Sequence, residues 1–154
     1  MTPTTVTSPP QQLEAWVSFL RAHAAITREL SAQLQREHGL TLNDYEVLLH
    51  LSHAEDRRLR RVDLAERVLL TPSGITRLLK GLETAGYVSN RPCAEDARVT
   101  YAVLTPEGKA KLDEARKTHV ASVRALFSER FEKDELGTLA SLLERLPLRD
   151  TACD

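Results

Sequence analysis

The chain has 154 residues, of which 42% are hydrophobic and only 5% aromatic, and its net charge is −1. This length suits one domain with an adequate core, and the scarcity of aromatic residues favours helices over a β-sandwich or β-barrel. The sequence has no run of roughly 20 apolar residues to span a membrane, and its N-terminus lacks the basic start and apolar run of a signal peptide. We therefore expect a cytoplasmic protein without a membrane partner.

The two ends of the chain differ in composition from the part between them. Residues 1–10 are rich in Thr and Pro and have almost nothing to bury, so we expect a disordered tail there. We expect a flexible tail over residues 148–154 and a single domain over residues 11–147. The two cysteines, Cys93 and Cys153, are too few for a disulfide framework and fit no metal-binding pattern. The sequence thus predicts neither a metal nor a cofactor.

A long first helix is predicted over residues 13–37, where apolar side chains recur at helical spacing. The apolar stripe is broad, which indicates burial against more than one partner, and Gly39 follows as the stop. A second helix is predicted to begin at Asn43, with Glu46 three residues later in a capping-box pattern. The predicted inner face of this second helix consists of Tyr45, Leu48, Leu49 and Ser52.

The connection after the second helix, residues 53–61, is strongly charged, and a short strand containing Leu59 fits there. A short helix is then predicted over residues 62–68. Its inward-facing residues are Leu64, Ala65 and Val68.

The next predicted helix has clear start and stop signals. Thr71 is a good N-cap, and Pro72 occupies the first helical position, where its missing N–H costs nothing. Gly86 supplies a left-handed stop. The apolar face consists of Ile75, Leu78, Leu79 and Leu82. Two helices joined by only a few residues form a helix-turn-helix arrangement.

The spacing of apolar residues then changes from the helical period to alternation, which predicts two strands over residues 87–91 and 98–104. The polar segment between them lacks a tight two-residue turn, so we expect a wing with an extended tip. Thr105 and Pro106 repeat the cap-plus-proline start and open a long helix to about Ser128. The inner face of that helix includes Leu112, Ala115, His119, Val123 and Phe127.

A final helix is predicted over residues 133–146. Its apolar residues are Leu136, Leu139, Leu143 and Leu146. The elements together predict a mainly α (α+β) fold, in which a winged helix-turn-helix with a two-stranded wing, about residues 43–105, is flanked by N- and C-terminal helices.

The positive charge of the chain is concentrated in its centre. Residues 57–98 hold nine Lys and Arg against five acids, a balance of +4, whereas residues 1–56 have a balance of −4 and residues 99–154 of −1. Binding to phosphates needs such a local positive potential and does not need a net positive charge on the whole chain. The major groove of duplex DNA, about 12 Å wide, admits one helix whose outward side chains reach the base edges. The sequence therefore predicts a DNA-binding protein.

The helix-turn-helix supplies most of the expected DNA contacts. Arg77 can reach a guanine bidentately, and Thr76 can touch a thymine methyl group or a phosphate. Small residues at the N-terminal end of the helix let the backbone approach phosphates closely, and Arg61 and Arg67 of the short helix can reach the sugar-phosphate chain. The predicted DNA-binding residues here are Arg61, Arg67, Thr71, Pro72, Ser73, Gly74, Thr76, Arg77 and Lys80.

The wing adds a second predicted contact through Arg91, Asp96 and Arg98. An arginine at the tip, Arg98, can enter a narrow minor groove, where negative potential is concentrated. Asp96 is not expected to face DNA itself. It either orients Arg98 or Arg91, or it pins the hairpin.

With these elements in place, the chain resembles the MarR family of regulators. The resemblance depends on the helix-turn-helix, on residues 82–88 (LETAGYV), on the Asp96-Ala97-Arg98 motif of the wing and on residues 104–108 (LTPEG), and above all on their joint spacing. It covers roughly residues 13–146. By motif match it implies that Ser73, Thr76 and Arg77 contact DNA from the recognition helix, and Arg98 from the wing.

The resemblance also implies an obligate homodimer, joined through the helices at residues 13–37 and 106–146. Such a dimer would bind a pseudo-palindromic operator on double-stranded DNA, usually as a repressor that small anionic or phenolic effectors or oxidants release. The residues agree with a dimer, because one recognition helix and one wing make too few contacts for a specific site. Two features depart from the family: Ala97 stands where a second charged residue is common, and the first helix lacks the cysteine of peroxide sensors.

Several alternatives remain open from the sequence. Trp16, Phe19, His23 and His119 either line an effector pocket or pack in an ordinary core. Cys93 in the wing is either an inert cysteine or the thiol of a redox-responsive regulator. The winged helix could also be a module that binds another protein, which would show no salt-dependent affinity for DNA. An enzyme is not expected, because the chain has no nucleophile–base pair, phosphate loop or paired carboxylates.

Overall fold

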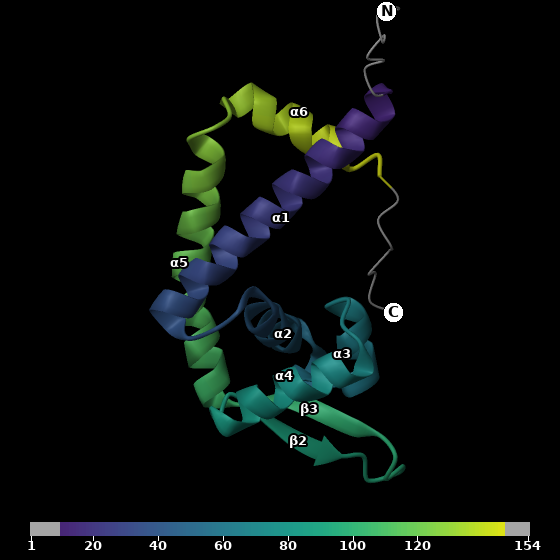
Figure 1. Ribbon diagram of the computed structural model, residues 1–154. Coiled ribbons are helices and arrows are strands. Elements are labelled where there is room, and N and C mark those ends of the chain that lie inside the picture. Colours follow the sequence, from purple (N-terminus) through teal and green to yellow (C-terminus); the bar gives the residue numbers. More distant parts are fainter. Residues whose placement is uncertain (1–9, 147–154) are drawn as a thin grey trace, which may run out of the picture.

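The computed structural model describes residues 10–146, so the predicted tails lie outside the described residues, apart from Pro10 at the start of the first helix. Helix α1 (Gln11–His38) ends at Gly39, whose φ of 68° lies in the left-handed region. Figure 1 shows α1 running diagonally, with its C-terminal end beside α5 and its N-terminal half overlapped in this view by the end of α6. The predicted long first helix and its glycine stop are confirmed.

Helix α2 (Leu42–His53) begins earlier than predicted. The capping box is formed by Thr41, whose hydroxyl accepts from the Asp44 N–H at 3.1 Å, while the Asp44 carboxylate accepts from the Thr41 N–H at 2.8 Å. The prediction of Asn43 with Glu46 was therefore wrong, because Thr41 offers both an extended backbone and an acid at the third helical position.

The inner face of α2 also differs in part from the prediction. Val47 and Leu51 are fully buried together with Tyr45 and Leu48, since α2 packs against α1, α5 and the sheet at once. Ser52 instead donates its hydroxyl to the Leu49 carbonyl at 2.7 Å. An element enclosed on several sides has a wider buried face than a single stripe predicts.

The connection after α2 contains a short helical turn, η1 (Glu55–Arg57), and strand β1 (Arg58–Arg60). The helix-turn-helix follows as α3 (Arg61–Arg67) and α4 (Pro72–Thr84). The wing consists of β2 (Val88–Pro92) and β3 (Thr100–Leu104). The short strand with Leu59, the two helices and the two wing strands are confirmed.

The sheet has three antiparallel strands in the order β1-β3-β2, so β3 is central and the wing is more than the two-stranded hairpin that we predicted. Leu59 of β1 lies opposite Ala102, which in turn lies opposite Asn90 of β2. Ala102 is fully buried. This pairing attaches the wing to the helical core at the base of the hairpin.

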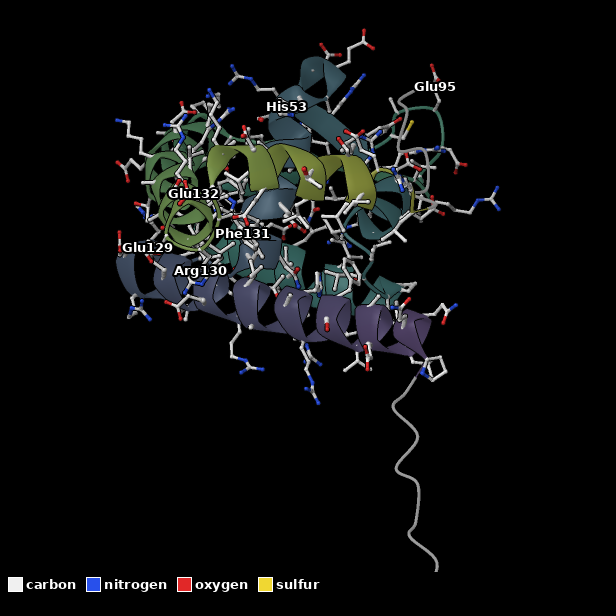
Figure 2. The ribbon with its side chains drawn as sticks, turned by 90° about the horizontal axis from the view of Figure 1, so that it is seen from above. His53, Glu95, Glu129, Arg130, Phe131 and Glu132 are labelled. Atoms are coloured by element: carbon white, nitrogen blue, oxygen red, sulfur yellow. The ribbon has the colours of Figure 1, made fainter. Side chains whose placement is uncertain are left out.

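Two helices complete the described part. Helix α5 (Pro106–Ser128) is capped by Thr105, and α6 (Lys133–Leu143) ends three residues before the predicted limit. Figure 2 places the α5–α6 turn, from Glu129 to Glu132, and Glu95 of the wing at opposite sides of the molecule. None of the α6 residues is fully buried: within its predicted apolar stripe Leu136 and Leu139 are half-buried, and Leu143 and Leu146 are exposed.

The hydrophobic core lies between α2, the helix-turn-helix, the sheet and the first half of α5. Its buried members are Leu34, Leu40, Tyr45, Val47, Leu48, Leu51, Leu64, Ala65, Val68, Ile75, Leu79, Leu82, Val88, Ala102, Leu104, Leu112 and Ala115. The fold is thus mainly helical with a small antiparallel sheet, as the sequence predicts.

Candidate nucleic-acid interface

Helix α4 presents one polar side to solvent and packs the other into the core. The Thr71 hydroxyl accepts from the Gly74 N–H at 3.1 Å, and Pro72 occupies the first turn, so the predicted cap is confirmed. The buried side carries Ile75, Leu79 and Leu82, with Leu78 half-buried. The exposed residues on the other side are Ser73, Thr76, Arg77 and Lys80.

Gly74 has a structural role beside the one that we predicted. A Cβ atom at Gly74 would lie 3.1 Å from the Thr71 hydroxyl oxygen, which is tighter than ordinary contact. A glycine here leaves room for the cap, whose hydrogen bond takes up the Gly74 N–H. The Thr76 hydroxyl donates to the Pro72 carbonyl at 2.8 Å, which leaves its methyl group as the free end of the side chain.

The two arginines of α3 lie in different surroundings. The Arg61 guanidinium is 3.9 Å from a Glu83 carboxylate oxygen, across the helix-turn-helix. The Arg61 Nε and this oxygen are both buried without a hydrogen-bond partner. Arg67 is half-buried near His50, and burial lowers the pKa of His50, with a further contribution from the charge of Arg67. Arg61 therefore also braces α3 against the end of α4.

The tip of the wing is organised by Asp96. One Asp96 carboxylate oxygen accepts from the Arg98 N–H at 3.0 Å and lies 3.5 Å from the Arg98 Nε. The Val99 N–H donates to the Asp96 carbonyl, and the Cys93 N–H donates to the Val99 carbonyl. Asp96 therefore contacts Arg98, not Arg91, and it also holds the turn of the hairpin. The Arg98 side chain is 94% exposed at the tip.

Two further wing residues are placed by the sheet. Arg91 is exposed on β2, directly opposite Tyr101 of β3. Cys93 is half-buried where the hairpin leaves the sheet. Its redox role stays a prediction.

The four predicted effector-pocket residues do not form one group. Trp16, Phe19 and His23 form a row along α1, with successive ring centroids 6.4 Å apart, and all three are exposed. His119 instead packs against Tyr45, with 4.6 Å between the ring centroids. Burial lowers the pKa of His119. In the single chain the row on α1 is therefore neither a closed pocket nor an ordinary core.

His23 also lines a hollow of about 650 Å³ between α1, α2 and the turn after α3. Its walls include Arg28 and Glu46, and its rim includes Leu69. Sequence reasoning missed these residues because they come from three elements. One available signal was the polar stripe His23, Thr27 and Ser31, which recurs every four residues on the side of α1 that faces α2.

The described residues, 10–146, bear on two other classes of site. The helices there are all too short or too polar to cross a membrane. No group of three or more His, Cys, Asp or Glu side chains in that part of the chain is placed to hold a metal ion.

A capped helix with a polar outer side, a preceding short helix and an arginine-tipped hairpin define a winged helix-turn-helix protein. The family model of the MarR family matches residues 38–99. AbsC, a MarR family transcriptional regulator from Streptomyces coelicolor, is 33% identical over 91% of this chain and 94% of its own, with a TM-score of 0.78. The chain belongs to the MarR family of transcriptional regulators, which are not enzymes.

Two further relatives are similar over different lengths. Sco3205, a MarR family regulator from Streptomyces coelicolor solved in complex with DNA, is 29% identical over 93% of this chain and 88% of its own, with a TM-score of 0.79. The transcriptional repressor YetL from Bacillus subtilis is 35% identical over 111 residues, 70% of this chain. The chain spans 66% of the length of YetL, just under two thirds.

Proposed function

We propose that this protein binds double-stranded DNA as a homodimer in the cytoplasm, at a pseudo-palindromic operator, and represses transcription until a small effector releases it. The observation that carries the proposal is the exposed polar side of α4, whose opposite side packs Ile75, Leu79 and Leu82 into the core. Two similar proteins add support: Sco3205 was solved in complex with DNA, and YetL is named a repressor.

The roles of the residues follow from their chemistry and exposure. Arg77, in the middle of the exposed side, reads a guanine edge, and Lys80, one turn later, contacts a phosphate. Ser73 and the backbone at Gly74 approach a phosphate at the helix N-terminus. Arg98 enters the neighbouring minor groove from the wing, held by Asp96.

The dimer is proposed from apolar side chains that the single chain leaves uncovered. Five of them lie on the N-terminal half of α1, namely Leu13, Trp16, Val17, Phe19 and Leu20, and each is at least 40% exposed. Leu142, Leu143 and Leu146 are exposed at the other end of the chain. A large contiguous apolar patch is rare on a monomer, so a second copy is its natural cover.

The central test compares two variants of α4. Arg77→Ala should cost about 1–3 kcal/mol of operator binding and relax sequence preference, because it removes a base contact. Lys80→Ala should weaken binding to all DNA similarly and flatten the dependence of affinity on salt, because it removes a phosphate contact. Affinities for the selected operator and for unrelated duplex, measured across salt concentrations, check both. Equal losses of specific and non-specific binding in both variants would show that these roles are wrongly assigned.

We further propose that a small anionic or phenolic effector binds beside the row on α1, next to the hollow at His23. The cationic Arg28 and the ring of His23 suit a carboxylate or a phenol, and Glu46 closes the opposite wall. Burial raises the pKa of Glu46, and the nearby charge of His23 opposes that shift.

The effector proposal predicts a fluorescence response, because Trp16 is the single tryptophan and stacks on Phe19 next to His23. Titration with phenolic acids should change the emission of Trp16 and lower operator affinity at the same concentrations. Arg28→Ala should shift both curves to higher concentration together. A panel of aromatic acids that leaves the emission unchanged would count against a pocket here.

A further inference from the structure

Three arginines surround one tyrosine on the outer face of the sheet. The strand register places Arg60 of β1 and Arg91 of β2 on either side of Tyr101 in β3. Ala102 is fully buried against the helices, so Tyr101 and its lateral neighbours face the other way. Arg58 shares this face with Arg60, two residues along the strand. We name Arg58, Arg60 and Arg91 the outer arginine cluster.

Specific contacts hold two members of the cluster in place. The Arg58 guanidinium lies 5.1 Å from the centre of the Tyr101 ring and 3.5 Å from an Asp56 oxygen. Arg60 makes a bidentate contact to Asp63, at 2.8 and 3.2 Å. Their side chains nevertheless remain 53% and 51% exposed. Guanidinium groups held in this way lose little further freedom when they bind a ligand.

The outer face of the sheet bears no helix within the described part of the chain. α2 packs against β3, α4 against β2, and α3 against β1 and β3, and Figure 1 shows these helices together on one side of the strands. The other side is thus free to meet a partner. Arginines suit oxygen anions, because the planar guanidinium has five N–H donors, of which Arg60 gives two to Asp63.

The position of the cluster favours DNA over another acidic partner. β2 and β3 run from the cluster directly into the hairpin tip that carries Arg98. The cluster is therefore continuous with the surface proposed for the minor groove. Duplex DNA carries one negative charge per about 1.7 Å of its axis, so any backbone that passes the tip brings several phosphates within reach of these side chains.

We propose that the outer arginine cluster binds the phosphate backbone of the DNA that flanks the operator, beyond the minor groove that Arg98 enters. The proposal rests on the proposed function, and it lengthens the segment of DNA that the dimer contacts at both of its ends. It assigns Arg58 and Arg60, which sequence reasoning did not select, a role in affinity without a role in sequence preference.

The test uses two duplexes that carry the operator recovered from random DNA with the purified protein. One ends at the operator, and the other extends it by about one helical turn, roughly 10 base pairs, on each side. The wild-type protein should bind the extended duplex several-fold more tightly, with a steeper salt dependence. Arg58→Glu should bind both duplexes with the affinity that the wild-type protein has for the short duplex. On the extended duplex it should also lower the slope of log affinity against log salt by about 2, because each of the two protomers loses one phosphate contact. Arg58→Lys should keep most of the gain.

The control is Arg36→Glu, which makes the same charge change at an exposed position on α1; it should keep the full preference for the extended duplex. If the wild-type protein gains nothing from the flanks, or if Arg58→Glu weakens both duplexes equally, the proposal is wrong. Wild-type protein that recovers no operator from random DNA would overturn the proposed function as well. A protein that ignores the flanks but binds poly-glutamate through Arg58 would point to an acidic protein partner instead.

Discussion

Replacing Leu20 by glutamate should convert the protein from a dimer to a monomer. Leu20 is 43% exposed in the single chain and shares one stripe of α1 with Leu13, Trp16 and Val17. A dimer that covers this stripe would have to bury the new carboxylate in an apolar contact, which is strongly unfavourable without a partner. The N-terminal half of α1 lies well away from α4 (Figure 1), so a direct effect on DNA contacts is not expected.

The loss of the dimer should have a large effect on operator binding. Two linked recognition helices gain about 100-fold or more over one, because the second half-site is bound at high effective concentration. The operator affinity of Leu20→Glu at a palindromic site should therefore fall by at least that factor. The variant should still unfold cooperatively on heating, as a folded protein does. Light scattering after size-exclusion chromatography measures the mass, and titration of labelled operator measures the affinity.

The matched control is Gln35→Glu, which adds the same charge to an exposed position near the other end of α1. It should stay dimeric and bind the operator as the wild type does. A Leu20→Glu protein that remains dimeric would show that the apolar stripe is not the dimer contact. A wild-type protein that is monomeric at micromolar concentration would remove the basis of the dimer altogether.

The sequence predicts most reliably those elements whose boundaries are set by local chemistry. Thr71 and Thr105 both cap helices that begin with proline, and in both cases the hydroxyl accepts from the N–H of a glycine three residues later. These signals depend on backbone geometry within one turn, so no knowledge of the rest of the fold is required. The left-handed glycines at positions 39 and 86 were predictable for the same reason.

What the sequence did not predict depends on distant parts of the chain. The pairing of β1 with β3 joins residues more than forty positions apart, and the ion pair of Arg61 with Glu83 needs the angle between α3 and α4. The choice of Asn43 over Thr41 was a local error between two good caps, decided by which third position held the better-placed acid. The separation of His119 from the row on α1 follows from where α5 crosses α1, which no spacing reveals.

Gly108 illustrates a position whose requirement becomes visible only in three dimensions. It lies in the first turn of α5, and its N–H donates to the Thr105 hydroxyl at 3.0 Å. A Cβ atom at this position would clash with the Tyr87 carbonyl oxygen and approach the Leu104 Cδ1 to 2.9 Å. That carbonyl is itself fixed, because it accepts from the Thr105 N–H at 3.1 Å. Backbone from the start of the wing therefore touches the start of α5.

Gly108→Ala should accordingly destabilise the protein by about 3 kcal/mol, the upper end for overpacking, since backbone rather than a flexible side chain must move. For a chain of this size that corresponds to a fall in Tm of about 6–12 °C, measured by circular dichroism at fixed protein concentration. Gly81→Ala is the control: it lies in α4 with nothing within 4 Å of the added carbon, and it should raise stability by about 0.5–1 kcal/mol. Equal melting of Gly108→Ala and the wild type would mean that the wing and α5 are not joined this closely, and the wing would then have to be positioned by the β1–β3 pairing alone.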